Sequence, residues 1–338
     1  MKKKKELLFN KKDKRELRAW LASDGTERVT VSFYRYVRIE NPEEVRDDLY
    51  RQWSEIGCLG RIYTAKEGIN AQMSVPKENW KSFEKHLQSD PKWTDMPFKF
   101  GVEDDGKSFF KLKIKVREKI VADGLEEDVD FAYLGTHVKP CDWNALLSDA
   151  ETICVDMRNK YESEVGHFEG AICPEVATFR EELPVVKELL KDKKEKPIAL
   201  YCTGGIRCEK ASAYIRQNGF KNVYQLEGGI IDYAHEVAKS GTESKFKGKN
   251  FVFDERLGER ITEDVLANCY LCKDACDRHT NCKNVACNLL FIQCESCAEG
   301  LEGCCSTACQ KINALDEEAQ RDLRKGQKRQ SELQIAGC

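Results

Sequence analysis

Long apolar stretches are missing from this sequence of 338 residues. No segment approaches the ~20 consecutive apolar residues of a membrane-spanning helix, which argues against a membrane partner. The basic start at Lys2–Lys5 is not followed by the apolar core of a secretory signal, so we expect a cytoplasmic protein. The net charge is only −3, so the strongly basic character of many nucleic-acid-binding chains is also absent. Any basic surface must therefore be local.

Cofactor motifs are missing as well. The sequence has no glycine fingerprint for flavin or nicotinamide binding, and no clear set of two histidines and a carboxylate for non-haem iron. Cysteine, in contrast, occurs 17 times. In a reducing compartment, so many cysteines indicate metal binding or catalysis rather than structural disulfides.

The most informative segment is Cys202-Thr203-Gly204-Gly205-Ile206-Arg207, which follows an apolar strand pattern and precedes a helical one. The glycines allow the backbone to curl so that successive N–H groups point inward, and the helix N-terminus adds its positive end. These donors favour the thiolate form of Cys202, and Arg207 adds a permanent positive charge. We therefore predict an anion-holding nucleophile loop rather than an ordinary turn before a helix.

The length of this loop narrows its chemistry. Four residues separate Cys202 from Arg207, and such a loop suits one terminal atom better than a tetrahedral phosphate. A cysteine phosphatase is therefore the least favoured interpretation. The segment resembles the active loop of rhodanese-like domains, and the resemblance covers residues 147–241. Asp156, Arg158 and His167 lie in segments that look like the other rhodanese signatures. We expect Asp156 and Arg158 to brace the loop or bond to each other, and His167 to support the fold through a hydrogen bond.

Cys208 directly follows the loop. It could form a disulfide with an oxidised Cys202. Because it begins a helix, however, we expect its side chain to point away, as a packing residue.

The order of expected strands and helices predicts several domains. Residues 29–116 show the pattern strand, helix, strand, strand, helix, strand, which is typical of a ferredoxin-like α+β sandwich. Strands near Thr152, Pro197 and Asn222 alternate with helices, which predicts a parallel α/β sheet. The expected fold class is thus a ferredoxin-like N-terminal sandwich, a rhodanese-like α/β domain and a small cysteine-rich C-terminal module. The expected boundaries are 1–25 for a basic lead-in, 26–118 for the sandwich, 119–146 for a linker, 147–241 for the rhodanese domain, 242–265 for a second linker, 266–312 for the cysteine module and 313–338 for a charged helix.

Cations alternate with apolar residues in an expected strand at Phe109–Val116. The alternation places Phe110, Leu112, Ile114 and Val116 on one face. The opposite face carries Lys111, Lys113, Lys115 and, just after the strand, Arg117. Like charges along one face repel unless an anion lies against them, and an RNA phosphate backbone is a natural partner. A solvated sheet face explains the pattern equally well. Further RNA-binding candidates nearby are Arg61 and Lys66.

The C-terminal module contains two Cys-x2-Cys pairs, Cys269/Cys272 and Cys294/Cys297, with a spacing common in zinc ribbons. The remaining metal candidates are Cys276, Cys282, Cys287, Cys304, Cys305 and Cys309. Because a tetrahedral site takes four ligands, these cysteines are enough for two zinc ions. Apolar residues are few here, so we expect structural zinc to stabilise the module, with iron–sulfur ligation and disulfides as alternatives.

Several segments together resemble one family, the bacterial oxygen-dependent tRNA uridine 34 hydroxylases, rhodanese-domain proteins that make 5-hydroxyuridine at the wobble position. The similar segments are Gly60–Asn70, Lys113–Gly124, Cys202–Ser212, Phe251–Asp254 and Thr280–Asn284. The resemblance implies Cys202 as the active-site residue and the anticodon loop of tRNA as a partner. It also implies molecular oxygen as co-substrate and an unidentified reductant. A persulfide-donor or electron-donor protein is a further partner to consider.

The residues leave more than one role open for Cys202. As a nucleophile it could add to C6 of uracil and make C5 electron-rich enough to react with oxygen, while the loop N–H groups and Arg207 stabilise the enolate. As a persulfide carrier it would serve a sulfurtransferase. A non-catalytic RNA-binding protein would need only the basic strand and the cysteine module. Hydroxylation is the main prediction and sulfur transfer is the alternative.

Overall fold

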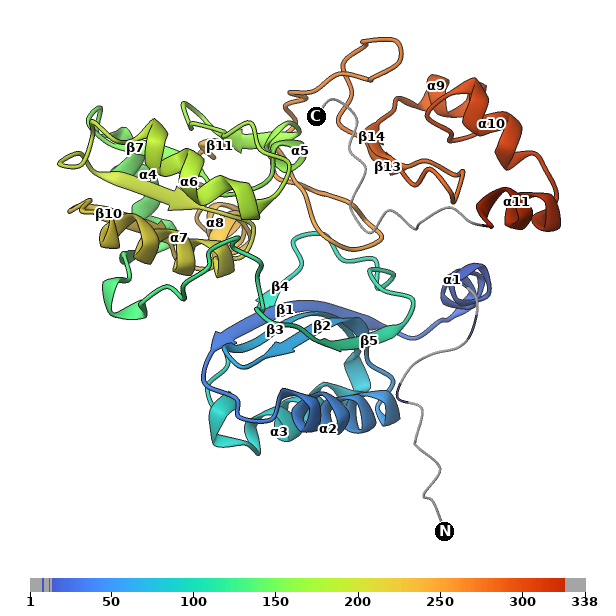
Figure 1. Cartoon of the computed structure of the whole chain (residues 1–338), viewed down its shortest axis with the longest axis horizontal. Coiled ribbons are helices and arrows are strands. Elements are labelled where there is room, and N and C mark those ends of the chain that lie inside the picture. The colour runs from blue at the N-terminus through green and yellow to red at the C-terminus, as the bar shows by residue number, and fades with distance from the viewer. Residues whose placement is uncertain (1–7, 9–11, 13, 326–338) are drawn as a thin grey trace.

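The structure is a computed structural model that describes residues 8, 12 and 14–325 of the chain. Figure 1 shows an N-terminal sandwich, an α/β domain that lies against one face of it, and a small C-terminal module. None of the described helices is long and apolar enough to cross a membrane.

The N-terminal domain has a five-stranded sheet in the order β4-β1-β3-β2-β5. Its strands are β1 (Arg28–Tyr36), β2 (Leu59–Ala65), β3 (Gly68–Pro76), β4 (Lys99–Phe100) and β5 (Leu112–Val116). Helices α2 (Pro42–Glu55) and α3 (Trp80–Gln88) cover one face, and the other face points toward the α/β domain (Figure 1). The short 3-10 helices η1 (Lys77–Asn79) and η2 (Pro91–Trp93) flank α3. This order confirms the ferredoxin-like sandwich, with β5 added parallel to β2 at the edge.

The alternating strand predicted at Phe109–Val116 begins only at Leu112. Phe109 and Phe110 are both buried, because they pack against helix α1 (Lys14–Ser23) through an apolar cluster with Leu17 and Leu21. Two successive buried side chains cannot belong to one face of a regular strand. The described part of the basic lead-in is therefore a helix that packs on the sandwich.

The α/β domain has a parallel four-stranded sheet in the order β6-β10-β9-β7. Its strands are β6 (Thr136–Val138), β7 (Ile153–Asp156), β9 (Ile198–Tyr201) and β10 (Val223–Leu226). Its helices are α4 (Pro140–Ser148), α5 (Lys160–Ser163), α6 (Phe179–Leu189), α7 (Ile206–Gln217) and α8 (Gly229–Ser240). The two faces of the sheet contribute to separate apolar clusters, as expected for a parallel sheet covered on both sides. The rhodanese-like fold is thus confirmed.

The two segments expected to be linkers contain regular structure. Residues 119–146 include the 3-10 helix η3 (Phe131–Tyr133), strand β6 and the start of α4. Residues 242–265 include β11 (Phe246–Asn250) and β12 (Glu259–Arg260), which form a small sheet with β8 (Gly166–Phe168). The strand β11 is difficult to recognise in the sequence, because Gly248 and Asn250 take the buried positions that apolar residues usually occupy.

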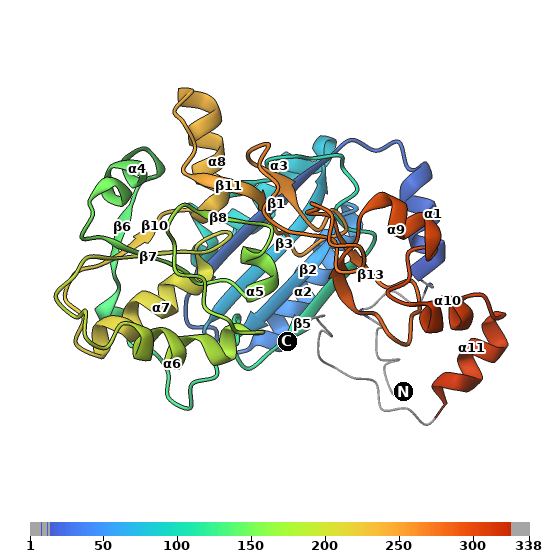
Figure 2. The same cartoon turned by 90° about the horizontal axis from the view of Figure 1, so that it is seen from above.

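The C-terminal module contains the hairpin β13 (His279–Asn281) and β14 (Leu290–Ile292) followed by α9 (Glu295–Gly300), α10 (Thr307–Asn313) and α11 (Glu317–Arg324). The charged helix expected at 313–338 corresponds to α11 in its described part, and residues 326–338 lie outside the described residues. Seen from above, α6 and α7 lie on one side of the N-terminal sheet and the helices of the module lie on the other (Figure 2).

Candidate active site

Cys202 lies in the loop between β9, which ends at Tyr201, and α7, which begins at Ile206. The backbone curls at Gly205, whose φ of 94° favours glycine. The Gly205 N–H donates a hydrogen bond of 3.2 Å to Cys202 Sγ. Gly229, at the start of α8, packs against the loop so closely that an added Cβ would lie 2.5 Å from the Cys202 carbonyl oxygen. The start of α8 thus packs closely against the loop, and the Gly205 N–H inside the loop donates to the sulfur.

The surroundings of Cys202 favour its thiolate form. Burial by itself would raise the pKa, because a charge is poorly solvated inside the protein. The Cys208 side chain, the charge of Arg207 and the backbone N–H groups of these two residues act in the opposite direction and lower the pKa of Cys202 to about 6. Burial, and then the hydrogen bond to Cys202, raise the pKa of Cys208 well above its ordinary value, so Cys208 stays a thiol and donates.

Cys208 is buried in the same apolar cluster as Cys202, so its expected packing role is confirmed. Its side chain nevertheless faces the Cys202 sulfur, so the expectation that it points away is wrong. Side chains in a helix lean toward its N-terminus. In the first turn of α7, this direction brings Cys208 back toward the loop.

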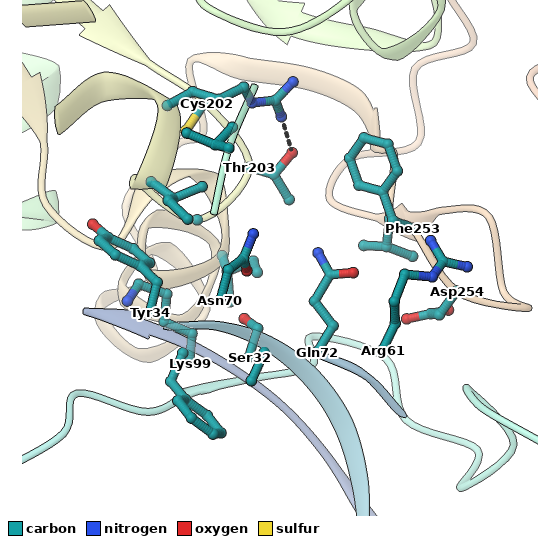
Figure 3. A pocket seen from close by; sticks show the side chains of 18 of the residues that line it. Ser32, Tyr34, Arg61, Asn70, Gln72, Lys99, Cys202, Thr203, Phe253 and Asp254 are labelled. Carbon is teal, nitrogen blue, oxygen red and sulfur yellow. Dashed lines mark hydrogen bonds between the residues drawn. The ribbon is translucent and has the colours of Figure 1, made fainter. Parts of the chain in front are cut away.

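Arg207 is engaged by a partner that the sequence did not reveal. Its Nη1 and Nη2 donate to the two carboxylate oxygens of Glu162 at 2.6 and 2.9 Å. Nη2 also donates to Thr203 Oγ1 at 3.2 Å (Figure 3). Arg207 and Glu162 are both buried. These hydrogen bonds fix the loop, and the positive charge of Arg207 acts on Cys202 through space. The helix-start pattern Asn159-x-x-Glu162, which forms a capping box, was the available signal.

Asp156 and Arg158 form a buried ion pair with each other. Arg158 Nε lies 2.9 Å from Asp156 Oδ1, and Nη2 lies 2.7 Å from Oδ2. The Tyr201 hydroxyl donates to the same carboxylate at 2.8 Å. Because Tyr201 directly precedes Cys202, this pair braces the end of the strand that leads to Cys202. His167 Nδ1 lies 2.9 Å from the Ser163 carbonyl oxygen, and His167 does not line the cavity described next.

A cavity of about 390 Å³ lies between this loop and the N-terminal sheet. The loop contributes Cys202, Thr203, Gly204, Ile206 and Arg207. Strands β1 and β3 contribute Ser32, Asn70 and Gln72, which rise from the sheet toward the loop in Figure 3. The residue Cys202 borders the cavity but has 0% exposed surface. Its sulfur can therefore contact a substrate only after the side chains at the base of the cavity shift.

The N-terminal domain also supplies the two ends of this cavity. Tyr34 and Lys99 lie at one end, and Arg61 lies at the other beside Phe253 and Asp254 (Figure 3). The Tyr34 hydroxyl donates to Glu209 of α7 at 3.0 Å. Sequence reasoning missed Tyr34 and Lys99, because neither belongs to a recognisable motif and their proximity to Cys202 depends on how two domains pack.

The cations predicted on one face along β5 lie close to one another, as their alternation in the sequence predicts. Lys113 lies opposite Arg61 of β2. Burial, followed by the charges of Lys115, Arg61, Lys111 and Arg117, lowers the pKa of Lys113 to about 8. Of the six RNA-binding candidates, Arg61 lines the cavity, and the others lie outside its lining. Lys66 is exposed in the turn between β2 and β3.

Eight cysteines of the C-terminal module form two groups of four. One group is Cys269, Cys272, Cys294 and Cys297, and the other is Cys282, Cys287, Cys305 and Cys309. Within each group the sulfur atoms all lie within 4.8 Å of one another. Four sulfurs at such separations fit a closed tetrahedral zinc site with Zn–S bonds of about 2.3 Å. Both Cys-x2-Cys pairs fall in the first group, whereas Cys276 and Cys304 belong to neither group.

Comparisons with known proteins agree with this architecture. Residues 28–120 match a family described as UPF0176 acylphosphatase like domain, residues 142–236 match the rhodanese-like domain, and residues 247–310 match a family described as rhodanase C-terminal. Fold and site together define a rhodanese-domain protein whose nucleophile loop is covered by an acylphosphatase-like domain.

Curated relatives specify the family further. The chain is 53% identical to a tRNA uridine(34) hydroxylase of Leptospira interrogans, over 96% of this chain and 88% of that protein. Proteins of the same name from Photorhabdus laumondii and Yersinia pestis are 50% and 52% identical, over 95% of this chain and 92% and 91% of theirs. The chain therefore belongs to the tRNA uridine(34) hydroxylase family. This supports hydroxylation over the sulfurtransferase alternative.

Among solved structures, a rhodanese-like domain from Anabaena is similar over 34% of this chain and 80% of its own length, with 18% identity. Its TM-score of 0.27 is too low to add to the argument.

Proposed function

We propose that this protein hydroxylates C5 of uridine 34 in tRNA with molecular oxygen, and that Cys202 is the nucleophile that activates the base. The observation that carries this proposal is the thiolate-stabilising loop at the base of a cavity of about 390 Å³. This volume is within the range of small-ligand sites. The opposite wall offers uncharged polar side chains, including Gln72 and Asn70, that suit the hydrogen-bonding edge of a uracil base.

The proposed reaction begins with addition of the Cys202 thiolate to C6 of uracil. The S–C6 bond forms, the C5=C6 double bond breaks, and its electron pair moves to O4 as an enolate. The enolate then forms a C5–O bond with oxygen, and a two-electron reductant such as a dithiol cleaves the O–O bond to leave the C5 hydroxyl and water. Loss of the C5 proton restores the C5=C6 bond as the S–C6 bond breaks and returns the thiolate.

The substrate fits this site because bases of an anticodon loop are already accessible, so little energy is needed to extrude one. Arg61 lines the cavity and lies opposite Lys113 on the neighbouring strand. We propose that the cations of β5 follow the phosphate backbone while the target base enters the cavity. We expect the substrate to be tRNA in the cytoplasm. The cytoplasmic location of the protein stays a prediction.

We also propose that each cysteine group holds one structural zinc ion. The donor set is four sulfurs without an open position, so the ion would stabilise the module rather than take part in the reaction. The apolar cluster of this module is small and consists largely of cysteines. The zinc ions would supply stability that such a small core cannot provide.

The proposal is tested by nucleoside mass spectrometry of tRNA from cells that lack the protein. We expect the loss of 5-hydroxyuridine derivatives, restored by the wild-type protein and not by Cys202→Ala. The chemical step is tested with an anticodon stem-loop that carries 5-fluorouridine at position 34, because fluorine blocks the proton loss that would release the enzyme. Wild type should form a covalent adduct on Cys202. Restoration by Cys202→Ala would contradict the role of Cys202.

A further inference from the structure

Lys99 occupies an unusual position next to the nucleophile loop. It lies on β4, paired with Ser32 of β1, and is only 5% exposed. Its side chain passes beneath the loop, because a Cβ added to Gly204 would lie 3.6 Å from Lys99 Cδ. Lys99 lines the cavity together with Cys202. The N-terminal domain thus places a cation at one end of the cavity, next to the loop of the other domain.

Other buried cations in residues 14–325 have carboxylate partners. Arg158 pairs with Asp156, Arg207 with Glu162, Lys210 with Asp123, and Arg28 with Asp24. Lys99, in the same described part of the chain, makes no ion pair within 4.0 Å, and its Nζ lies 4.8 Å from the centre of the Tyr34 ring. Burial of a charge without a close partner is unfavourable. Such a cation is therefore most easily explained if a ligand completes its surroundings.

The groups that face Lys99 explain why it can carry a charge. Burial lowers its pKa, whereas Asp232 on α8, Cys202 in the loop, and Glu209 and Glu227 act in the opposite direction from a distance. The neighbouring helix α8 packs on β4, where His235 Nε2 lies 2.9 Å from the Phe100 carbonyl oxygen. Lys99 is consequently held between the sheet, α8 and the loop, with the cavity as its open side.

We propose that Lys99 is a catalytic residue whose ammonium group donates a hydrogen bond to O4 of the target uracil. The inference rests on the addition of Cys202 to C6 described above. As the S–C6 bond forms, negative charge develops on O4, and Lys99 stabilises it. When C5 bonds to oxygen, the electron pair leaves O4, the carbonyl is restored, and Lys99 keeps its proton. Arg207 cannot fill this role as directly, because Glu162 and Thr203 already occupy its guanidinium group.

The test compares Lys99→Met and Lys99→Arg with wild type and with Lys81→Met, a change at an exposed lysine of α3 outside the cavity lining. The rate of adduct formation is measured in a single turnover with the 5-fluorouridine stem-loop, and the dissociation constant for unmodified stem-loop is measured separately. Loss of a donor to a developing oxyanion slows reactions by about 100-fold or more, so we expect this for Lys99→Met with RNA binding changed less than about threefold. Lys99→Arg should be intermediate, and Lys81→Met should match wild type.

The outcomes distinguish a failure of the role of Lys99 from a failure of the C6 addition by Cys202. An adduct formed by Lys99→Met as fast as by wild type would overturn the role of Lys99 while leaving the role of Cys202 intact. Absence of an adduct with wild type would overturn the C6 addition and, with it, the role of Lys99. If Lys99→Met does not fold, as judged by its melting temperature, Lys99→Gln replaces it. Equal adduct rates for Lys99→Gln and Lys99→Arg would then show that the charge has no part in the reaction.

Discussion

Cys202 in the rhodanese-like domain and the grouped cysteines of the C-terminal module have different surroundings. In the rhodanese-like domain, Cys202 is fully buried, and backbone amides, the Cys208 thiol and Arg207 favour its anion. In the C-terminal module, eight cysteines lie in two groups whose sulfurs face one another, and several of them are partly exposed. The surroundings in one region favour a single buried thiolate, whereas in the other region the sulfurs lie close enough together for each group of four to hold a metal ion. The comparison shows that the chemical state of a cysteine in this chain depends on its neighbours more than on its exposure.

The largest effect is expected for Cys202→Ser. A hydroxyl in this loop is not ionised near neutral pH, so hydroxylation of tRNA should fall by about 1,000-fold or more. Product formation is measured by nucleoside mass spectrometry, and melting temperature is measured as the check on folding. The same substitution at Cys141, an exposed cysteine outside the metal groups, should leave the rate unchanged. A Cys202→Ser enzyme with near-normal turnover would remove the distinction between the two regions.

The second prediction is that bound metal depends on the cysteines of the C-terminal module. Native mass spectrometry should find two zinc ions, one for each cysteine group. Cys269→Ser should lose one ion and lower the melting temperature, because a metal that binds only the folded state stabilises it. Cys276→Ser is the matched control, since Cys276 lies nearby but outside both groups. Equal metal loss in both variants would contradict the assignment of ligands.

The pair between Arg207 and Glu162 provides a third test. Glu162→Gln leaves the buried Arg207 charge without its partner, and breaking such pairs destabilises proteins by about 3–5 kcal/mol. The free energy of unfolding is measured by urea denaturation. Glu175→Gln removes one carboxylate that pairs with Lys160 at the surface and should cost less than about 1 kcal/mol. Similar losses in the two variants would show that the buried pair does not hold the loop.

The smallest effect concerns the pH dependence of the reaction. Because the thiolate is the reactive form, kcat/KM should rise with pH through a midpoint of about 6, the pKa of Cys202. Cys208→Ala removes a hydrogen-bond donor to the thiolate, so the midpoint should move to higher pH. A Cys141→Ala enzyme should keep the wild-type midpoint. An unchanged midpoint in Cys208→Ala would mean that the backbone and Arg207 alone set this pKa.

Local patterns in the sequence predict much of the fold and part of the site. Hydrophobic alternation and helix-start residues such as Asn41-Pro42 predict the order of elements in the sandwich, and the run from Cys202 to Arg207 predicts the nucleophile loop. Strand β11 was missed because Gly248 and Asn250 fill its buried positions.

Contacts between distant segments could not be predicted in this way. The second cysteine group contains no Cys-x2-Cys pair, so its composition depends on the folded module. Lys99 approaches the loop only because the N-terminal sheet packs on the α/β domain, and no local pattern records this. Glu162 is intermediate, since its capping pattern was visible but its partner Arg207 was not.

The central claim is that Cys202 is a thiolate near neutral pH. The most direct measurement is the rate of iodoacetamide labelling of the Cys202 peptide as a function of pH, followed by mass spectrometry, which separates this peptide from the other cysteines. We predict slow labelling, because the sulfur is buried, with a midpoint of about pH 6. A midpoint near the value of about 8.5 for an ordinary thiol would contradict the account.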